Sequence, residues 1–287
     1  MAVANFIPEI WSKKLQKILD KSCVMANLVN RDYEGEIKNA GDTVHVRTFG
    51  DVTVNNYTRD MVLTFQSLTD PMSDLVIDQQ KYFAFKLDDL DKAQSDIKIL
   101  EGYAKRAAEA IREVVDLRLH AHYADADADN IIGSVGSPIT LTKDNVYGYI
   151  CDLGQKLDES NAPPDDRHLV GDPRLKNLLK KSPEFTHATG MGDKVITNGK
   201  IGTVGDFTVH VSTNLNSSSS NRPLLALTKD FISFASQVEK VEKVRPTNMF
   251  CDVVKGLYLY GSKVFTNTDT DKGPDKCGAV LWASGVS

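Results

Sequence analysis

The sequence predicts an α+β fold, in which helical and strand patterns occupy different stretches of the chain, and three observations support this. Much of the stretch 43–87 alternates apolar and polar residues, which is typical of strands with one buried face. Residues 94–123 carry apolar residues three and four positions apart, which predicts one long amphipathic helix. Residues 141–236 mix short helical and strand patterns, which indicates a separate α/β lobe.

The predicted helix at 94–123 is long for a globular protein. Asp91 or Ser95 can cap its start, and about thirty residues at ~1.5 Å each reach roughly 45 Å. Charged residues, Asp116 among them, fall on the side expected to be solvated. Two interpretations are open: a core helix of a globular enzyme, or the spine of a flat, elongated subunit. The predicted inward stripe comprises Ile97, Leu100, Ala104, Ala107, Ile111 and Val114, widened by Val115 and Leu119.

Two segments before this helix are expected to need a packing partner. Residues 8–19 follow helical spacing from Pro8 onward and predict an N-terminal amphipathic helix of about four turns. Residues 50–75 predict a long β-hairpin that leaves the body of the protein, with strands beginning near Val52 and at 61–66. An isolated hairpin is marginally stable in water, so it should pack on its own core or on a neighbouring subunit.

The lobe is expected to begin with a helix that Thr142 caps and that runs to about residue 158. A strand at 167–170 and a helix starting at Asp172-Pro173 follow, and strands are expected at 207–211 and 224–227. The glycine-rich stretch 190–205 predicts a loop. Further on we expect an exposed strand around 238–244, three short strands between 252 and 265, and a short apolar end at 279–282.

Composition excludes several classes of protein. The chain has 287 residues, 41% of them hydrophobic, and a formal net charge of −5, which argues against a surface that grips nucleic acid. Four cysteines are scattered without a CxxC pair, which indicates free thiols. There is no apolar run long enough for a membrane span and no pattern of a signal peptide, so we expect a soluble chain without a membrane partner.

No catalytic or metal-binding motif stands out. His120 and His122 face different sides of the predicted helix and cannot share a metal ion. The spacing of Asp125, Asp127 and Asp129 matches the start of a calcium loop, but Asn130 replaces the required glycine and residue 136 lacks the bidentate glutamate. The glycines between 190 and 205 match no nucleotide-binding loop. We therefore predict no catalytic residue, no metal site and no cofactor.

A series of short segments supports a more specific interpretation, because they occur in a fixed order along residues 6–266. The segments are FIPEIWS at 6–12, NRDYEGEI at 30–37, GDTV at 41–44, IDQQKYFAF at 77–85, IG at 201–202, FTV at 207–209 and KGL at 255–257. With these segments the chain resembles the major capsid proteins of tailed bacteriophages.

The resemblance implies a fold with named parts. Residues 1–40 would form an N-terminal arm, and residues 41–80 an extended loop built on a β-hairpin. Residues 81–140 and 237–287 would form a peripheral domain containing the spine helix, and residues 141–236 an axial domain. The implied function is self-assembly as pentamers and hexamers into an icosahedral shell that encloses the phage genome, in a virion assembled in the host cytoplasm.

The resemblance also implies partners and contacts. The partners are other copies of the chain, a portal protein and packaged DNA bound without sequence specificity; because the sequence begins almost at the arm, a separate scaffolding protein is also expected. No lysine lies between Lys38 and Lys81, so the lysine–asparagine cross-link of some family members is not expected. An α+β enzyme of unidentified activity and a tail-tube subunit remain alternatives. The residues expected at contacts between subunits are Trp11, Arg59, Leu63 and Phe65.

Overall fold

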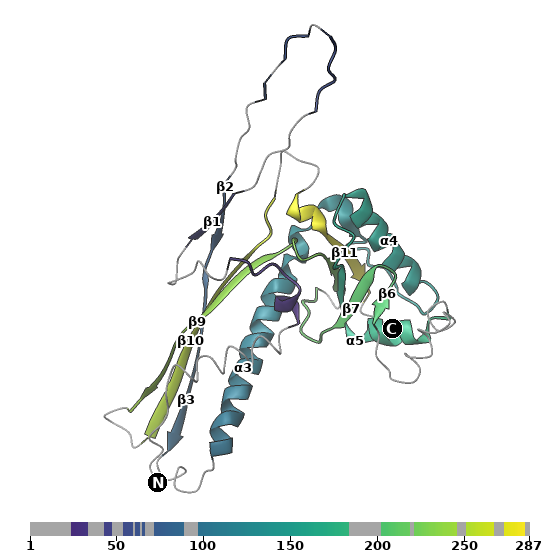
Figure 1. The fold of residues 1–287 in the computed structure, drawn as a ribbon. Helices are drawn as coiled ribbons and strands as arrows, with labels where there is room; N and C mark the ends of the chain where they lie inside the picture. Colours follow the sequence, from purple (N-terminus) through teal and green to yellow (C-terminus); the bar gives the residue numbers. More distant parts are fainter. Residues whose placement is uncertain are drawn as a thin grey trace.

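The computed structural model shows an elongated part and a rounder lobe joined side by side (Figure 1). The predicted N-terminal helix at 8–19 and most of the glycine-rich stretch 190–205 lie outside the residues that the structure describes. Those residues are 24–33, 43–47, 54–59, 61–63, 65–66, 72–88, 97–183, 202–218, 221–245, 251–266 and 273–284.

The long helix is confirmed as α3 (Ile97–His120), which continues into a short 3-10 segment, η3 (Ala121–Asp125). The predicted buried stripe is only partly right. Ile111, Val115 and Leu119 are buried as predicted, whereas Val114 is 39% exposed and Ala108 is buried in place of the half-buried Ala107. The buried face is therefore shifted by about one residue at two positions, from Ala107 to Ala108 and from Val114 to Val115, and the packing partners of the helix determine that shift.

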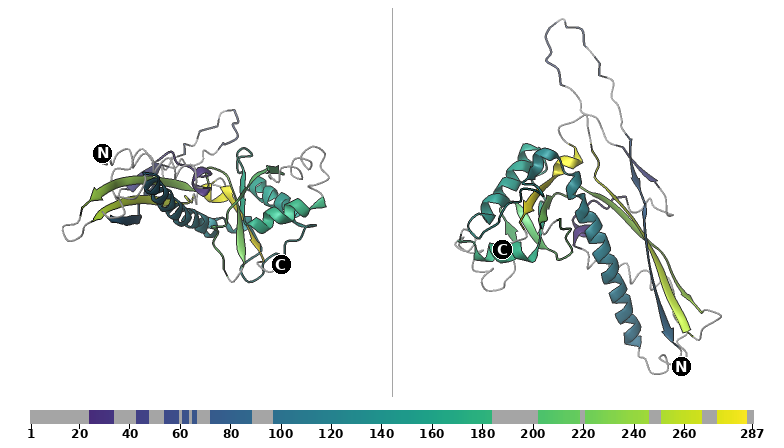
Figure 2. Two further views of the ribbon diagram at one scale, coloured as in Figure 1. Left: turned by 90° about the horizontal axis from the view of Figure 1, so that it is seen from below. Right: turned by 180° about the vertical axis from the view of Figure 1, so that it is seen from behind.

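A three-stranded antiparallel sheet lies beside α3. Its order is β3 (Gln79–Asp88), β10 (Cys251–Lys263) and β9 (Ser233–Val244), and Figure 2 shows α3 lying along one face of it. Tyr258 and Val254 of the sheet share a buried cluster with Val115 of the helix. Strand β10 is continuous where three short strands were expected, with one register shift against β9 between Leu257 and Tyr258. The strand is hydrogen-bonded along both edges, to β3 on one side and to β9 on the other.

A two-stranded ribbon stands at the base of the extended loop. Strands β1 (Thr43–Arg47) and β2 (Met72–Val76) pair in antiparallel register. This confirms a hairpin at the base, but the strands predicted further out are not observed, because the described residues between 54 and 66 contain no strand. A two-stranded ribbon has little apolar surface to pack against, so pairing at its far end has little support from within the subunit.

The lobe is a mixed sheet between two layers of helix. Its strand order is β4 (Ile131–Ile132), β11 (Gly278–Ala283), β8 (Arg222–Leu227), β5 (His168–Gly171), β7 (Phe207–Val211) and β6 (Thr203–Val204). Helices α4 (Val146–Glu159) and α5 (Pro173–Lys181) cover one face, and η3 with the end of α3 covers the other. Strand β11 shows the alternation directly: Leu281 packs toward α4, whereas Val280 and Trp282 pack toward η3.

Two expectations about the lobe need correction. Its sheet contains β4 and β11, which lie outside the range 141–236, and the segment expected to be a short apolar end is a central strand with all six residues buried. Helix α4 begins at Val146, later than expected, with Asn145 at its N-cap; one turn earlier, the Thr142 amide donates to the Asn145 carboxamide oxygen and the Thr142 carbonyl accepts from the Val146 amide. The start of α5 is confirmed: the Asp172 side chain accepts from the Leu175 amide, and Pro173 follows.

Candidate inter-subunit surface

The most exposed apolar side chains of the described chain lie on the extended loop. Phe65 is 91% exposed, Val62 is 86% exposed and Val54 is 92% exposed. Tyr57, Met61 and Leu63 are exposed as well, at 72%, 40% and 58%. These exposed apolar side chains are interspersed with polar ones along the loop, and a group of large apolar side chains in contact with water is typical of a surface that another molecule covers.

The base of this loop is firmly packed. Leu75 and Ile77 are fully buried and form a small cluster with Leu259 and Phe265 of the long β10 region. The Lys263 ammonium donates a hydrogen bond to the Asp74 carbonyl across the same junction. The apolar loop is therefore carried on a well-packed ribbon, and Figure 1 shows it projecting away from both parts of the protein.

Three of the four contact residues predicted from sequence lie in the described part of the chain, and one does not. Arg59, Leu63 and Phe65 lie close in sequence on the extended loop, and all three are exposed. Trp11 lies outside the described residues. The exposure of the first three leaves them accessible to another subunit, and their role in contacts stays a prediction.

A buried carboxylate on α3 was missed from sequence. Asp116, expected on the solvated face, is 1% exposed. Its carboxylate accepts hydrogen bonds from the Met25 amide at 3.2 Å and the Val24 amide at 3.5 Å, at the start of the 3-10 helix η1 (Met25–Asn27). Burial raises the pKa of Asp116 to about 6, against the opposing effect of these amides and of Arg112. Asp116 thus attaches the segment 24–29 to the spine helix.

A buried histidine joins the spine helix to the lobe. His120 is fully buried; its Nδ1 accepts from the Asn216 amide, which leaves its Nε2–H to donate to the Pro223 carbonyl at 3.1 Å. Burial lowers the pKa of His120 to about 4, so the ring is neutral at physiological pH. Both partners belong to the lobe, and the histidine therefore has a structural role at the junction.

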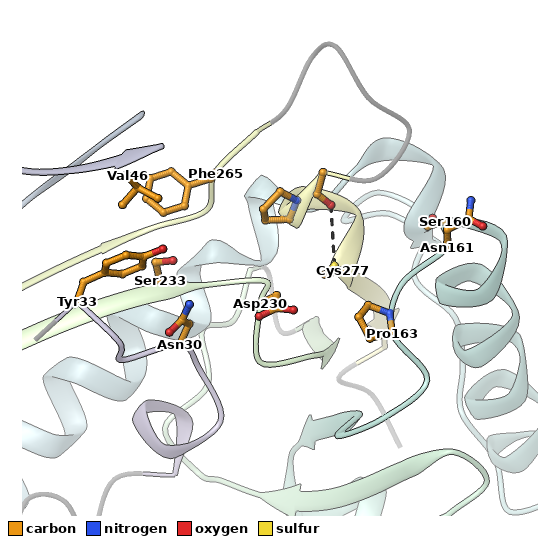
Figure 3. Close-up of a pocket in the computed structure, with 12 residues that line it drawn as sticks. Asn30, Tyr33, Val46, Ser160, Asn161, Pro163, Asp230, Ser233, Phe265 and Cys277 are labelled. Carbon is orange, nitrogen blue, oxygen red and sulfur yellow. Dashed lines mark hydrogen bonds between the residues drawn. The ribbon is translucent and has the colours of Figure 1, made fainter. Parts of the chain in front are cut away.

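A cleft of about 380 Å³ lies where the lobe meets the elongated part (Figure 3). Polar groups from several elements line it, including Asn30, Asp230 and Cys277. The Cys277 thiol is directed at the Gly273 carbonyl, and burial raises its pKa, so it is not an activated nucleophile. These groups do not form a nucleophile–base arrangement among the described lining residues.

The described residues offer little for a metal ion. No group of three or more histidine, cysteine or acidic side chains in this part of the chain is placed to hold one. Two carboxylates of the suspected calcium loop are engaged locally: Asp125 contacts His122 Nδ1 at 2.6 Å, and Asp127 accepts from the Asp129 amide at 2.9 Å. In the same described ranges, no helix is long and apolar enough to cross a membrane.

Comparison with solved structures identifies the fold. No family model and no curated protein matches the chain. A structure from Mycobacterium phage Che8 has a TM-score of 0.71 and 26% identity, covering 98% of each chain. The capsid structure of cyanophage P-SCSP1u has a TM-score of 0.70 at 15% identity, covering 99% of this chain and 91% of that one. The mature capsid of bacteriophage PhiM1 has a TM-score of 0.65 at 13% identity, covering 93% and 88%.

This chain has the capsid fold of tailed bacteriophages. The similarity extends over nearly the whole chain, so the elongated part and the lobe both belong to the capsid fold. The structures printed as capsids are those of cyanophage P-SCSP1u and bacteriophage PhiM1, and these similarities favour neither an enzyme nor a tail-tube subunit. Within the capsid fold, the exposed apolar loop is the candidate surface for contacts between subunits.

Proposed function

We propose that the chain is a major capsid protein, which self-assembles as pentamers and hexamers into an icosahedral shell that encloses a phage genome. The observation that carries this proposal is the apolar extended loop on its well-packed base. Side chains such as Val62 and Phe65 lose little contact with water inside one subunit, since they are 86% and 91% exposed. A neighbouring subunit that covers them provides the missing burial.

The energy available from this burial is substantial. Burying apolar surface contributes about 25 cal/mol per Å², so a few hundred Å² per loop contributes several kcal/mol before the cost of association. In a closed shell the same contact is repeated at every subunit. The exposed loop thereby supplies a driving force that a monomer does not use.

As a capsid protein, the chain is divided into an arm, an extended loop, a peripheral domain and an axial domain. We assign residues 1–40 to the arm, 41–80 to the extended loop, 81–140 with 237–287 to the peripheral domain except for β4 and β11, and 141–236 to the axial domain. Strands β4 and β11 complete the sheet of the axial domain although they lie outside that range. Loop and arm contact neighbouring subunits, through Trp11, Arg59, Leu63 and Phe65.

The proposed partners are those of a shell protein. Copies of the chain bind one another, and a separate scaffolding protein and a portal protein take part in assembly in the host cytoplasm. The finished virion contains DNA that the shell encloses without sequence-specific binding. A net charge of −5 is compatible with this, because an enclosing shell does not need a uniformly basic surface. The role is structural and not enzymatic.

Assembly of the purified protein tests the proposal. Sedimentation over a range of protein and salt concentrations, with and without the scaffolding partner, should show rings and shells, and electron microscopy should show closed icosahedral particles. A compact monomer under all of these conditions contradicts a shell function.

A further inference from the structure

The lobe carries a groove whose charge differs from that of the chain as a whole. The groove, of about 220 Å³, lies at the end of β11, where Ala283 and Ser284 form part of its wall. Three cations belong to its lining: Arg174, Lys181 and Arg222. Its apolar lining consists of Leu141, Leu175, Leu178, Leu224 and Ala283.

One carboxylate only partly offsets these cations. Asp172 lies 3.0 Å from Arg174 and 4.0 Å from Arg222, and it also caps α5. Lys176 and Lys180 add further positive charge on α5. The groove is therefore apolar at its centre and cationic around it, which suits an occupant with an apolar centre and acidic flanks.

A segment with that chemistry lies at the opposite end of the same strand. Residues 158–166 connect α4 to β5 and border the cleft that Gly273 and Cys277 also line, just before β11 begins. Pro163 and Pro164 are exposed at its centre. Its acidic residues are Asp158, Glu159, Asp165 and Asp166, and all are exposed. Six residues of β11 separate segment and groove, roughly 20 Å.

A buried arginine holds this acidic segment in one shape. The Arg167 side chain is 1% exposed and pairs with Asp158 at 2.7 Å. Its guanidinium also donates to the carbonyls of Pro163 and Ala162, at 2.9 and 3.0 Å. A segment that is ordered before binding loses less entropy on docking than a flexible one.

We infer that the acidic segment 158–166 of one subunit docks in the cationic groove of the next, head to tail around each ring. This inference rests on the proposed capsid function. A ring needs two different, complementary surfaces on each subunit, because the contact of a cyclic assembly is heterologous. The lobe provides such a pair at the two ends of β11. The exposed prolines meet the apolar centre of the groove, and the carboxylates of Asp165 and Asp166 meet its cations, while Asp158 stays paired with Arg167.

Two charge reversals test the inference. Lys181→Glu reverses a charge of the groove, and Asp165→Lys reverses a charge of the segment; both residues are exposed. Each variant alone should show at least a tenfold loss of rings at a concentration where the wild type forms them, measured by native mass spectrometry. Lys143→Glu and Asp152→Lys make the same charge changes at exposed positions outside both surfaces and should assemble like the wild type.

Mixing the two reversed variants gives the most specific outcome. In an alternating ring the substituted residue of the segment faces the substituted residue of the groove at one contact, and the two wild-type surfaces face each other at the next, so the mixture should recover six-membered rings. Five-membered rings cannot alternate and should stay rare. If wild-type rings form but both variants assemble like their controls, the inference is wrong and the capsid function stands. If the wild type forms no rings at all, the capsid function itself fails. If a charge-reversal variant melts at a lower temperature than the wild type, it is replaced by the neutral variant Lys181→Gln or Asp165→Asn. Each neutral variant should weaken ring formation, but less than the corresponding reversal.

Discussion

Strand β11 and the extended loop both carry large apolar side chains, but these side chains are buried to very different degrees. All six residues of β11 are buried, whereas Val54, Val62 and Phe65 of the loop are 92%, 86% and 91% exposed. Strand β11 has hydrogen-bonded strands on both edges and helices on both faces. The loop has only the β1–β2 ribbon at its base. Apolar side chains in a segment therefore indicate that the segment packs against other residues. The rest of the chain determines whether those residues belong to the same subunit or to another one.

Shortening the loop is expected to have the largest effect of all the proposed changes. It should impair assembly and leave the folding of the subunit unchanged. Replacing residues 55–66 by a short Gly-Ser turn should abolish shells or make them irregular, because the apolar contact surface is removed. Thermal melting followed by circular dichroism should stay cooperative, since the lobe and α3 pack without the loop. A matched control is Val135→Ser, at a 41% exposed apolar residue in a turn of the lobe. If the shortened protein no longer melts cooperatively, the loop belongs to the core of its own subunit, and the contrast with strand β11 is wrong.

The opposite result is expected in the lobe. Leu153 of α4 is fully buried in the cluster beneath the lobe sheet, and Leu153→Ala should lower the free energy of unfolding by about 2–5 kcal/mol. Leu63→Ala on the loop, at 58% exposure, should change that free energy by less than about 0.5 kcal/mol. Chemical denaturation measures both. If both variants lose the same free energy of unfolding, Leu63 is packed within its own subunit as Leu153 is, and the comparison between the loop and the lobe fails.

Asp116 predicts a pH dependence at the attachment of segment 24–29. Its pKa is raised in the folded protein from 3.8 to about 6, so the neutral form favours folding. That contribution is fully present below about pH 4 and is lost as the pH rises through about 6; the shift corresponds to roughly 3 kcal/mol over the whole window. Asp116→Asn cannot ionise. Relative to this variant, the wild type should become more stable between pH 7.5 and pH 5, by about 1 kcal/mol in denaturant titrations. Parallel pH profiles for the two proteins contradict a buried, titrating carboxyl.

Arg59 is expected to have the smallest effect. It is an exposed cation on the loop, and we predict that it pairs with a carboxylate of the neighbouring subunit. Arg59→Glu should weaken assembly more than Arg59→Ala, because the reversal adds repulsion to the loss of a pair. The difference in the concentration needed for shells, measured by light scattering, should shrink at high salt. If the two substitutions weaken assembly equally, Arg59 forms no ion pair with the neighbouring subunit, and the loop contributes to assembly through its apolar contacts alone.

The sequence by itself determined most of the secondary structure. The spacing of apolar residues predicts the long helix, and the Asp172-Pro173 pair predicts the start of α5, because these features depend on residues within a few positions of one another. The exposed loop was also readable, since its alternation of apolar residues occurs between polar turns. The order of short segments pointed to the capsid fold that the comparisons show.

Only the tertiary structure decided which surfaces meet. Asp116 looks like a solvated helix residue until segment 24–29, 91 positions away, places the Met25 amide against it. Val114 lies on the predicted stripe of α3 but is 39% exposed, because the residues that pack with Ala108 and Val115 come from segment 24–29 and from the sheet, both distant in sequence. Strand β11 looks like a short apolar end until pairing with β4 and β8 makes it central. Local spacing sets the period of a helix or strand, but the direction of its buried face depends on contacts between residues far apart in the chain, which no local pattern encodes.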